Sequence, residues 1–102
     1  MYVRIVTFGL SGLPHEEYVR HTGQIAAAFS GWPGLHAKIW LADPATNSYG
    51  GVYIFDTKDA ADASRCTDLF ARLLADSHFD GVSVTEFDVL DVPTAITAAM
   101  LR

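Results

Sequence analysis

The sequence predicts an α+β fold in which one four-stranded antiparallel sheet carries two helices on a single face. Four short segments rich in β-branched and aromatic residues are separated by turn residues, which is the pattern of strands. Two other segments repeat apolar side chains at helical spacing. The length of 102 residues suits one domain, which we expect to span residues 1–102.

The first strand and the first helix follow directly from the residue types. Residues 2–8 are mostly β-branched or aromatic and predict a strand, which the glycines of residues 9–12 end. Pro14 suits the first turn of a helix, and the two acidic residues that follow it complement the positive end of the helix dipole. The predicted helix covers residues 14–30. Its apolar stripe consists of Tyr18, Thr22, Ile25, Ala26 and Phe29.

The rest of the chain predicts a hairpin, a second helix and a last strand. Residues 35–42 and 49–55 read as strands, and the residues between them favour a tight turn. Thr57 is typical of a helix N-cap. The stripe of the second helix consists of Cys66, Leu69, Phe70 and Leu73. Residues 82–89 predict the fourth strand.

The predicted order β-α-β-β-α-β is the split arrangement of the ferredoxin-like fold. Such a sheet has helices on one face, so its other face needs cover. Pairing two sheets would hide that face and close a barrel, so we expect a homodimer. The apolar tail from Pro93 onward is expected to fold over the neighbouring subunit.

Composition excludes several classes of protein. Seven basic residues face twelve acidic ones, and the net charge of -5 disfavours nucleic-acid binding. No apolar stretch approaches the roughly 18 residues of a membrane span, and no signal peptide is evident, so we expect a cytoplasmic protein that does not bind membranes. Cys66 is the single cysteine and, on the apolar stripe of its helix, is expected to be a buried thiol rather than a nucleophile.

Four short motifs, taken in order, resemble one known family. They are Pro-Gly-Leu at 33–35, Lys-Ile-Trp at 38–40, Gly-Gly-Val-Tyr-Ile-Phe at 50–55 and Phe-Asp-Val at 87–89. Together they are similar to the YdhR-type family of "putative monooxygenases", which are small dimeric α+β barrel proteins. Members of that family can carry a histidine in the second helix, ahead of a stretch like Ala-Arg-Leu at 71–73. Residues 65–70 hold no histidine here, so a site built on a histidine of the second helix is not expected.

The resemblance to this family, rather than the composition of the chain, implies a function. Related barrels oxygenate aromatic polyketides without metal or flavin, and others degrade haem, isomerise, cyclise or only bind a ligand. The expected function is therefore that of a cofactor-independent monooxygenase acting on a small aromatic or polyketide-like molecule. The alternatives are a non-oxidative cyclase or isomerase, and a dimer that binds a small ligand without chemistry.

Lys38 and Trp40 are the first candidate site residues. They lie two apart in a strand and so share a face, with His36 beside them. A lysine can stabilise an enolate or phenolate, and an indole can stack on a ring and donate its N–H. The alternative is a lysine whose stem lies along a packed tryptophan while its ammonium reaches water.

Two aromatic residues of the third strand are candidates for substrate contact. Tyr53 and Phe55 share a face and could line a pocket or pack in a dimer interface. Whether that face also carries Trp40 depends on strand register, since a shift of one residue inverts every side chain.

Histidines are the candidates for a catalytic base, because their unperturbed pKa lies near neutrality. His21 is one turn from Tyr18, at the edge of the first helix's apolar stripe, and is the first candidate; Tyr18 is expected to contact the substrate. His36 is the second candidate, and the two other histidines lie near element ends, where solvent surrounds them.

No metal or other cofactor is expected. No two histidines have the i, i+4 spacing of a zinc helix, and Cys66 has no CxxC partner. Haem needs one axial histidine and an apolar slot, so haem binding stays open. Gly50 and Gly51 are expected to mark close backbone approach or a bulge rather than a phosphate loop.

Overall fold

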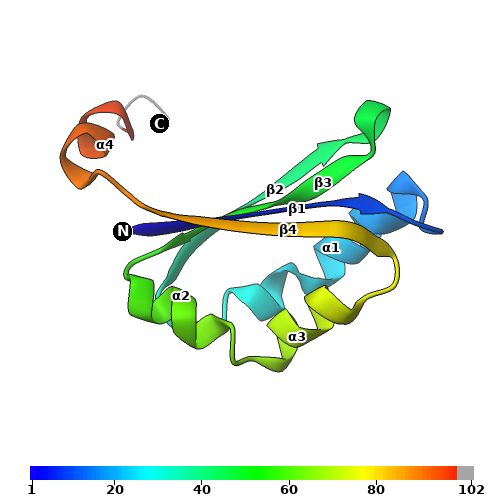
Figure 1. The fold of residues 1–102 in the computed structure, drawn as a ribbon, viewed down its shortest axis with the longest axis horizontal. Coiled ribbons are helices and arrows are strands. Elements are labelled where there is room, and N and C mark those ends of the chain that lie inside the picture. Colours follow the sequence, from blue (N-terminus) through cyan, green and yellow to red (C-terminus); the bar gives the residue numbers. More distant parts are fainter. Residues whose placement is uncertain (99–102) are drawn as a thin grey trace.

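The computed structural model describes residues 1–98 and contains one antiparallel sheet. The strands lie in the order β2-β3-β1-β4, so the two ends of the chain contribute neighbouring strands (Figure 1). This arrangement confirms the ferredoxin-like fold. The strands are β1 (Tyr2–Leu10), β2 (Leu35–Asp43), β3 (Ser48–Phe55) and β4 (Phe79–Asp88).

Three helices cover one face of this sheet, as Figure 1 shows. They are α1 (His15–Phe29), α2 (Lys58–Ser64) and α3 (Asp68–Ala75). A one-turn helix, η1 (Pro44–Thr46), forms the turn of the β2–β3 hairpin, and α4 (Asp91–Ala98) extends past the end of β4.

The second predicted helix is two helices rather than one. The Thr57 side chain accepts a hydrogen bond from the Ala60 amide, so the predicted N-cap is confirmed. A second cap follows, because the Thr67 hydroxyl accepts from the Phe70 amide and restarts the helix. The restart changes the helical phase, and this change decides which side chains reach the core.

Cys66 is the residue most affected by this break. It lies between α2 and α3 and is exposed, so the prediction of a buried thiol is wrong. Leu69, Phe70 and Leu73 of the same predicted stripe do pack against the core. Their common feature is that they follow the second cap, where the periodicity is that of α3 alone.

Replacing Cys66 with alanine should therefore leave the free energy of unfolding within about 0.5 kcal/mol of wild type, because an exposed side chain contributes little. Urea denaturation would measure this. A loss above roughly 1 kcal/mol would show that the thiol is packed after all.

The core consists of interlocking aromatic rings between the sheet and the helices. Every second residue of β1, from Tyr2 to Phe8, faces this layer. Trp32, which follows α1, stacks at 6.0 Å from the Tyr53 ring and 6.4 Å from the Phe55 ring. These contacts make the helix-covered face the aromatic face of the sheet.

Arg4 lies inside this aromatic layer and is fully buried. Its Nε donates to the Glu86 carboxylate at 2.6 Å, and its two terminal nitrogens donate to Ser64 Oγ and the Ala61 carbonyl at 2.9 and 2.8 Å. Arg65 reaches the same carboxylate at 2.9 Å. Each of the three nitrogens of the buried guanidinium thus donates a hydrogen bond to an acceptor. These bonds compensate for the loss of water on burial.

The opposite face of the sheet carries no helix over its centre in Figure 1. Two large apolar side chains on it, Ile39 and Phe87, are each about half exposed, at 51% and 53%. Three more apolar side chains, Leu90, Val92 and Ile96, are exposed on α4 and the segment before it. The apolar surface therefore continues from the sheet onto the last described helix.

Candidate functional site

The pairing of β2 with β3 decides which candidates face the helices. Lys38 lies opposite Tyr53, and Trp40 lies opposite Gly51. Directly paired residues point to the same side of a sheet, so all of them belong to the helix-covered face. Register thus brings Lys38, Trp40 and Tyr53 together.

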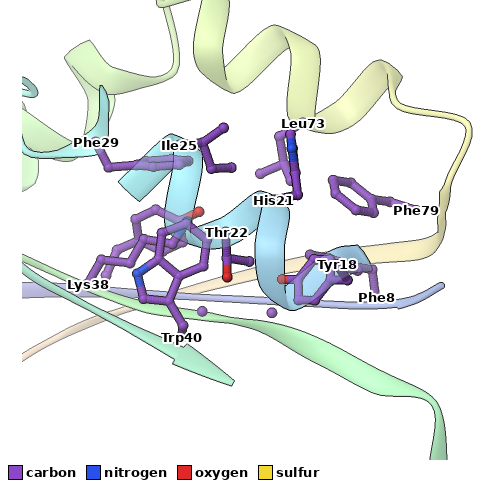
Figure 2. Close-up of a pocket in the computed structure, with 13 residues that line it drawn as sticks. Phe8, Tyr18, His21, Thr22, Ile25, Phe29, Lys38, Trp40, Leu73 and Phe79 are labelled. Atoms are coloured by element: carbon purple, nitrogen blue, oxygen red, sulfur yellow. The ribbon is translucent and has the colours of Figure 1, made fainter. Parts of the chain in front are cut away.

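A narrow cavity of about 30 Å³ lies between these strands and helices α1 and α3. Figure 2 shows Lys38 and Trp40 beside the sheet, with Phe29, Ile25 and Leu73 on the helix side. The remaining lining residues are Phe8, Tyr18, His21, Thr22, Gly50, Gly51, Tyr53 and Phe79. The lining is overwhelmingly apolar, so a charge within it is poorly hydrated.

The Lys38 ammonium is enclosed by aromatic rings. Its Nζ lies 3.4 Å from the centre of the Phe29 ring, 3.5 Å from that of Trp40 and 4.6 Å from that of Tyr53. None of the ion pairs between residues 1–98 includes it. Burial lowers its pKa to about 7, while the ring faces attract the ammonium form. Lys38 is therefore only partly exposed, and its ammonium lies against ring faces.

Two tyrosines of the cavity are held in their neutral form. Burial, with a smaller contribution from Tyr49, raises the pKa of Tyr18 to about 12. Burial also raises the pKa of Tyr53 well above its ordinary value, against the opposing charge of Arg4. Both phenols can therefore donate a hydrogen bond at any physiological pH.

The two adjacent glycines of β3 have different tasks. A Cβ at Gly50 would meet the Val6 carbonyl oxygen at 1.8 Å, which confirms the expected close backbone approach. A Cβ at Gly51 would instead meet Lys38 Cε at 2.9 Å and Tyr53 Cε1 at 3.4 Å. Gly51 thus leaves the space in which the Lys38 stem lies.

We expect alanine substitutions to distinguish the structural role of Gly50 from the space that Gly51 leaves for Lys38. Gly50→Ala should destabilise the fold by more than about 3 kcal/mol, because a backbone carbonyl cannot move aside. Gly51→Ala should fold, because the flexible lysine stem can shift, and turnover should fall on the order of tenfold as the amine leaves its position. Chemical denaturation and an activity assay measure the two effects, and equal instability of both variants would contradict the assignment.

His21 lies where the narrow cavity meets the outside. It is exposed, yet it lines the cavity and two wider clefts beside it, of about 230 and 450 Å³. The first of these clefts runs between α1 and α3 and includes Arg72 and Asp76. The second is more polar and includes Arg20 and His78. A molecule entering between α1 and α3 would pass the His21 ring.

The structure separates two other candidates from the cavity. His36 lies where the β2–β3 register shifts, is 66% exposed, and has its Nδ1 3.9 Å from an Asp56 carboxylate oxygen. It borders a shallow groove beside Lys38 and Trp40. Phe55 is fully buried between other aromatic rings and does not line the cavity, because it lies one pleat further along β3, against Trp32.

Sequence reasoning missed the residue nearest to the amine. Phe29 was expected only as part of the core stripe of α1, and it does pack there, but its ring also closes one side of the cavity over Lys38. Periodicity identified its face of the helix; no sequence signal indicated that a lysine would lie on that face.

The described part of the chain lacks two features that would bear on function. Residues 1–98 contain no group of three or more His, Cys, Asp or Glu side chains placed to hold a metal ion. None of the helices in this range combines the length and hydropathy that crossing a lipid bilayer requires.

Solved structures of similar shape include several oxygenases. SnoaB from Streptomyces nogalater, a cofactor-independent oxygenase, superposes with a TM-score of 0.69 at 19% identity, over 89% of this chain and 94% of that one. A protein from Deinococcus radiodurans described as a "putative antibiotic biosynthesis monooxygenase" gives a TM-score of 0.73 at 14% identity, over 90% of this chain and 95% of that one. The heme-degrader MhuD from Mycobacterium tuberculosis gives 0.70 at 19% identity, over 88% and 96%. At these identities the likeness establishes the fold.

Two curated relatives match over short segments. Both are tRNA dimethylallyltransferases: that of Ralstonia pickettii is 37% identical over 71 residues, 69% of this chain, and that of Dechloromonas aromatica is 45% identical over 47 residues, 45% of this chain. The matches span 20% and 15% of those relatives' lengths.

A family match covers almost the whole chain and agrees with the fold and with the motifs on β2, β3 and β4. The model of the family described as "Putative mono-oxygenase ydhR" matches residues 4–100, and the chain therefore belongs to this mono-oxygenase family.

Proposed function

We propose that this protein is a cofactor-independent monooxygenase that oxidises a small aromatic or polyketide-like molecule in the cavity of Lys38. The observation that carries the proposal is an amine enclosed by three aromatic rings in an apolar cavity. Such a cavity favours flat, apolar substrates, and its amine favours those that develop negative charge on oxygen.

The chemistry would begin with proton removal. His21, at the mouth of the cavity, would accept a proton from an activated CH₂ or phenol group of the substrate. The Lys38 ammonium would stabilise the resulting enolate or phenolate, and the neutral Tyr18 and Tyr53 hydroxyls would donate to its oxygens.

The substrate anion would then reduce dioxygen itself. In the overall reaction a substrate CH₂ group and O₂ give a C=O group and one molecule of water. The substrate supplies all the electrons, one oxygen atom enters the product, and the other leaves as water. The protein's part is to hold the anion in a dry site, because the attraction between the anion and the ammonium is stronger where water is excluded.

Entry of such a substrate requires the cavity to widen. Its 30 Å³ hold about one water molecule, whereas the adjoining cleft has about 230 Å³. Phe29, Leu73 and His21 line both spaces, so rotation of these side chains would join them. The substrate's ring would then lie between α1 and α3 with its oxygens toward Lys38.

An oxygen electrode tests this function. With an anthrone, a ketone that has an activated CH₂ group and whose enol tautomer is a phenol, and no added metal or flavin, we expect O₂ uptake and a product that carries one ¹⁸O atom from ¹⁸O₂. His21→Gln should reduce turnover by on the order of a hundredfold, the usual worth of a general base. Product formation without O₂ uptake would instead identify a cyclase or isomerase, and a protein that binds the phenol without product would be a binding module.

We further propose that the outer sheet face pairs with that of a second copy. The exposed Ile39 and Phe87 and the apolar surface of α4 support this homodimer. The expectation that the tail from Pro93 covers the neighbour applies to α4; its last part, residues 99–102, lies outside the described residues.

Sedimentation velocity at micromolar concentration should show a dimer. Ile39→Asp should convert it to a monomer, because each of the two copies would bury a charge in the paired sheet faces. Ala63→Asp, an exposed position on α2 on the helix side, is the matched control and should remain dimeric. A stable wild-type monomer would contradict the barrel.

A further inference from the structure

The surroundings of the Lys38 amine suit nucleophilic chemistry as well as the stabilisation of negative charge. Its neighbours are ring carbons, and no carboxylate lines its cavity. A lysine that serves only as a positive charge is usually accompanied by an anion or by water. Because an apolar cavity hydrates an ammonium poorly, it favours the uncharged amine, whose free lone pair makes it a nucleophile.

We propose that Lys38 captures small carbonyl compounds, above all 1,3-diketones and related polyketide-like ketones, as a covalent imine within the cavity. The proposal deepens the proposed function, on which its assignment of a substrate class rests. It identifies the substrate as one that carries a ketone or aldehyde group beside an acidic CH₂ group.

The ionisation of Lys38 is consistent with this role. Burial lowers the pKa of its amine to about 7, so at neutral pH about half of the molecules carry the reactive, uncharged form. An ordinary lysine, with a pKa of 10.5, would be uncharged on the order of a thousandfold less often. The titratable groups that face Lys38 across the cavity are Tyr18 and His21 on α1 and Tyr53 on β3.

The reaction balances with groups that line the cavity. The Nζ lone pair attacks the carbonyl carbon, and the carbonyl oxygen takes a proton to give a carbinolamine. The C–O bond then breaks, water leaves, and a C=N bond remains. Tyr18 and Tyr53 line the same cavity, and their phenol groups are the ones available to protonate the departing oxygen. The protonated imine withdraws electrons from the neighbouring CH₂ group and so eases the proton removal assigned to His21.

The sequence provides an internal control. The chain has two lysines, Lys38 and Lys58. Lys58 is 62% exposed and pairs with Asp62 at 3.0 Å, and that hydrogen bond and charge raise its pKa. At neutral pH its amine is therefore protonated and unreactive, so modification should distinguish the two lysines sharply.

Acetylacetone is the probe for the first experiment. A neutral amine condenses with it to a stable, strongly absorbing enaminone, which needs no oxygen. At pH 7, wild type and Lys58→Met should each gain the mass of one acetylacetone less one water, and peptide mapping should place it on residue 38. Lys38→Met and Lys38→Arg should gain none, although Lys38→Arg keeps the charge. Cyanoborohydride trapping of a small aldehyde should show the same order of variants.

Two results would overturn the proposal: no adduct on folded wild-type protein, or an adduct that forms equally on Lys58 or on the Met1 amine. Circular dichroism of each variant establishes that it is folded before labelling. Because labelling takes place without oxygen turnover, failure of the oxygenase assay leaves it interpretable. An oxygenase that forms no adduct would use Lys38 only as a charge.

Discussion

Lys38→Met should lower turnover on the order of a hundredfold while making the protein more stable. The loss of activity follows from removing a cation that stabilises negative charge at the transition state by roughly 2–4 kcal/mol. The gain in stability follows because folding of the variant no longer desolvates an ammonium. After the lost cation–π contacts are subtracted, we expect the free energy of unfolding to rise by about 2 kcal/mol. If instead the ammonium reached water, as in the alternative named above, removing it should barely change stability.

The pH dependence of stability tests the cause. Folding lowers the pKa of Lys38 from 10.5 to about 7, so between these values the unfolded chain binds more protons than the folded one. The contribution of Lys38 to stability is therefore least favourable below pH 7 and improves as pH rises toward 10.5. The stability advantage of Lys38→Met should accordingly shrink over that interval. Lys58→Met is the control, and an advantage that does not vary with pH would exclude desolvation as its origin.

Arg4→Met should lower the free energy of unfolding by about 3–5 kcal/mol, which corresponds to a fall in Tm on the order of 20 °C. The substitution leaves the Glu86 carboxylate with Arg65 alone and strands the Ser64 hydroxyl and the Ala61 carbonyl without their cationic donor. It also removes a guanidinium that lies 5.0 Å from the centres of the Phe55 and Phe70 rings. Arg20→Met, at an exposed position on α1, is the matched control and should change stability by less than about 0.5 kcal/mol.

Acid titration separates the charge of Arg4 from its packing. Burial raises the pKa of Glu86, but its hydrogen bonds and charge interactions with Arg4 and Arg65 outweigh burial and leave that pKa below 4.5. A carboxyl pKa depressed by folding stabilises the protein above its unfolded value, and that stabilisation is lost as pH falls. Arg4→Met should weaken this acid dependence. If the variant loses stability equally at every pH, packing rather than charge accounts for the loss.

The sequence predicts on which face of β1 Arg4 lies, but not the partners of its guanidinium. Alternation in β1 places residues 2, 4, 6 and 8 on one face, and three of these are apolar. A lone arginine on such a face indicates either an exposed face or a buried ion pair. Its partners come from α2 and β4, which lie about 60 and 80 residues away, and only the packing of the chain brings them to it.

The broken second helix illustrates the same limit at shorter range. Helical spacing after Thr57 predicted one stripe that included Cys66, because periodicity alone carries no information about where a helix restarts. The Thr67 hydroxyl restarts it, and the phase shift turns Cys66 outward while Leu69 and Phe70 stay against the core.

The sequence by itself determined the order of the four strands and the places of the helical segments that cover the sheet, and therefore the fold, because strand and helix periods, turn residues and caps act locally. It also identified His21, Lys38, Trp40, Tyr18 and Tyr53 as candidates, all of which line one cavity. Only the tertiary structure decided that they lie together and that His36 and Phe55 lie apart from them. The physical reason is register: the pairing of Lys38 with Tyr53 and the shift beside Leu35 set which face each β2 side chain takes. The same pairing lays the Lys38 stem over Gly51 and its amine against Phe29, and on these contacts rests the proposal that Lys38 differs chemically from a surface lysine.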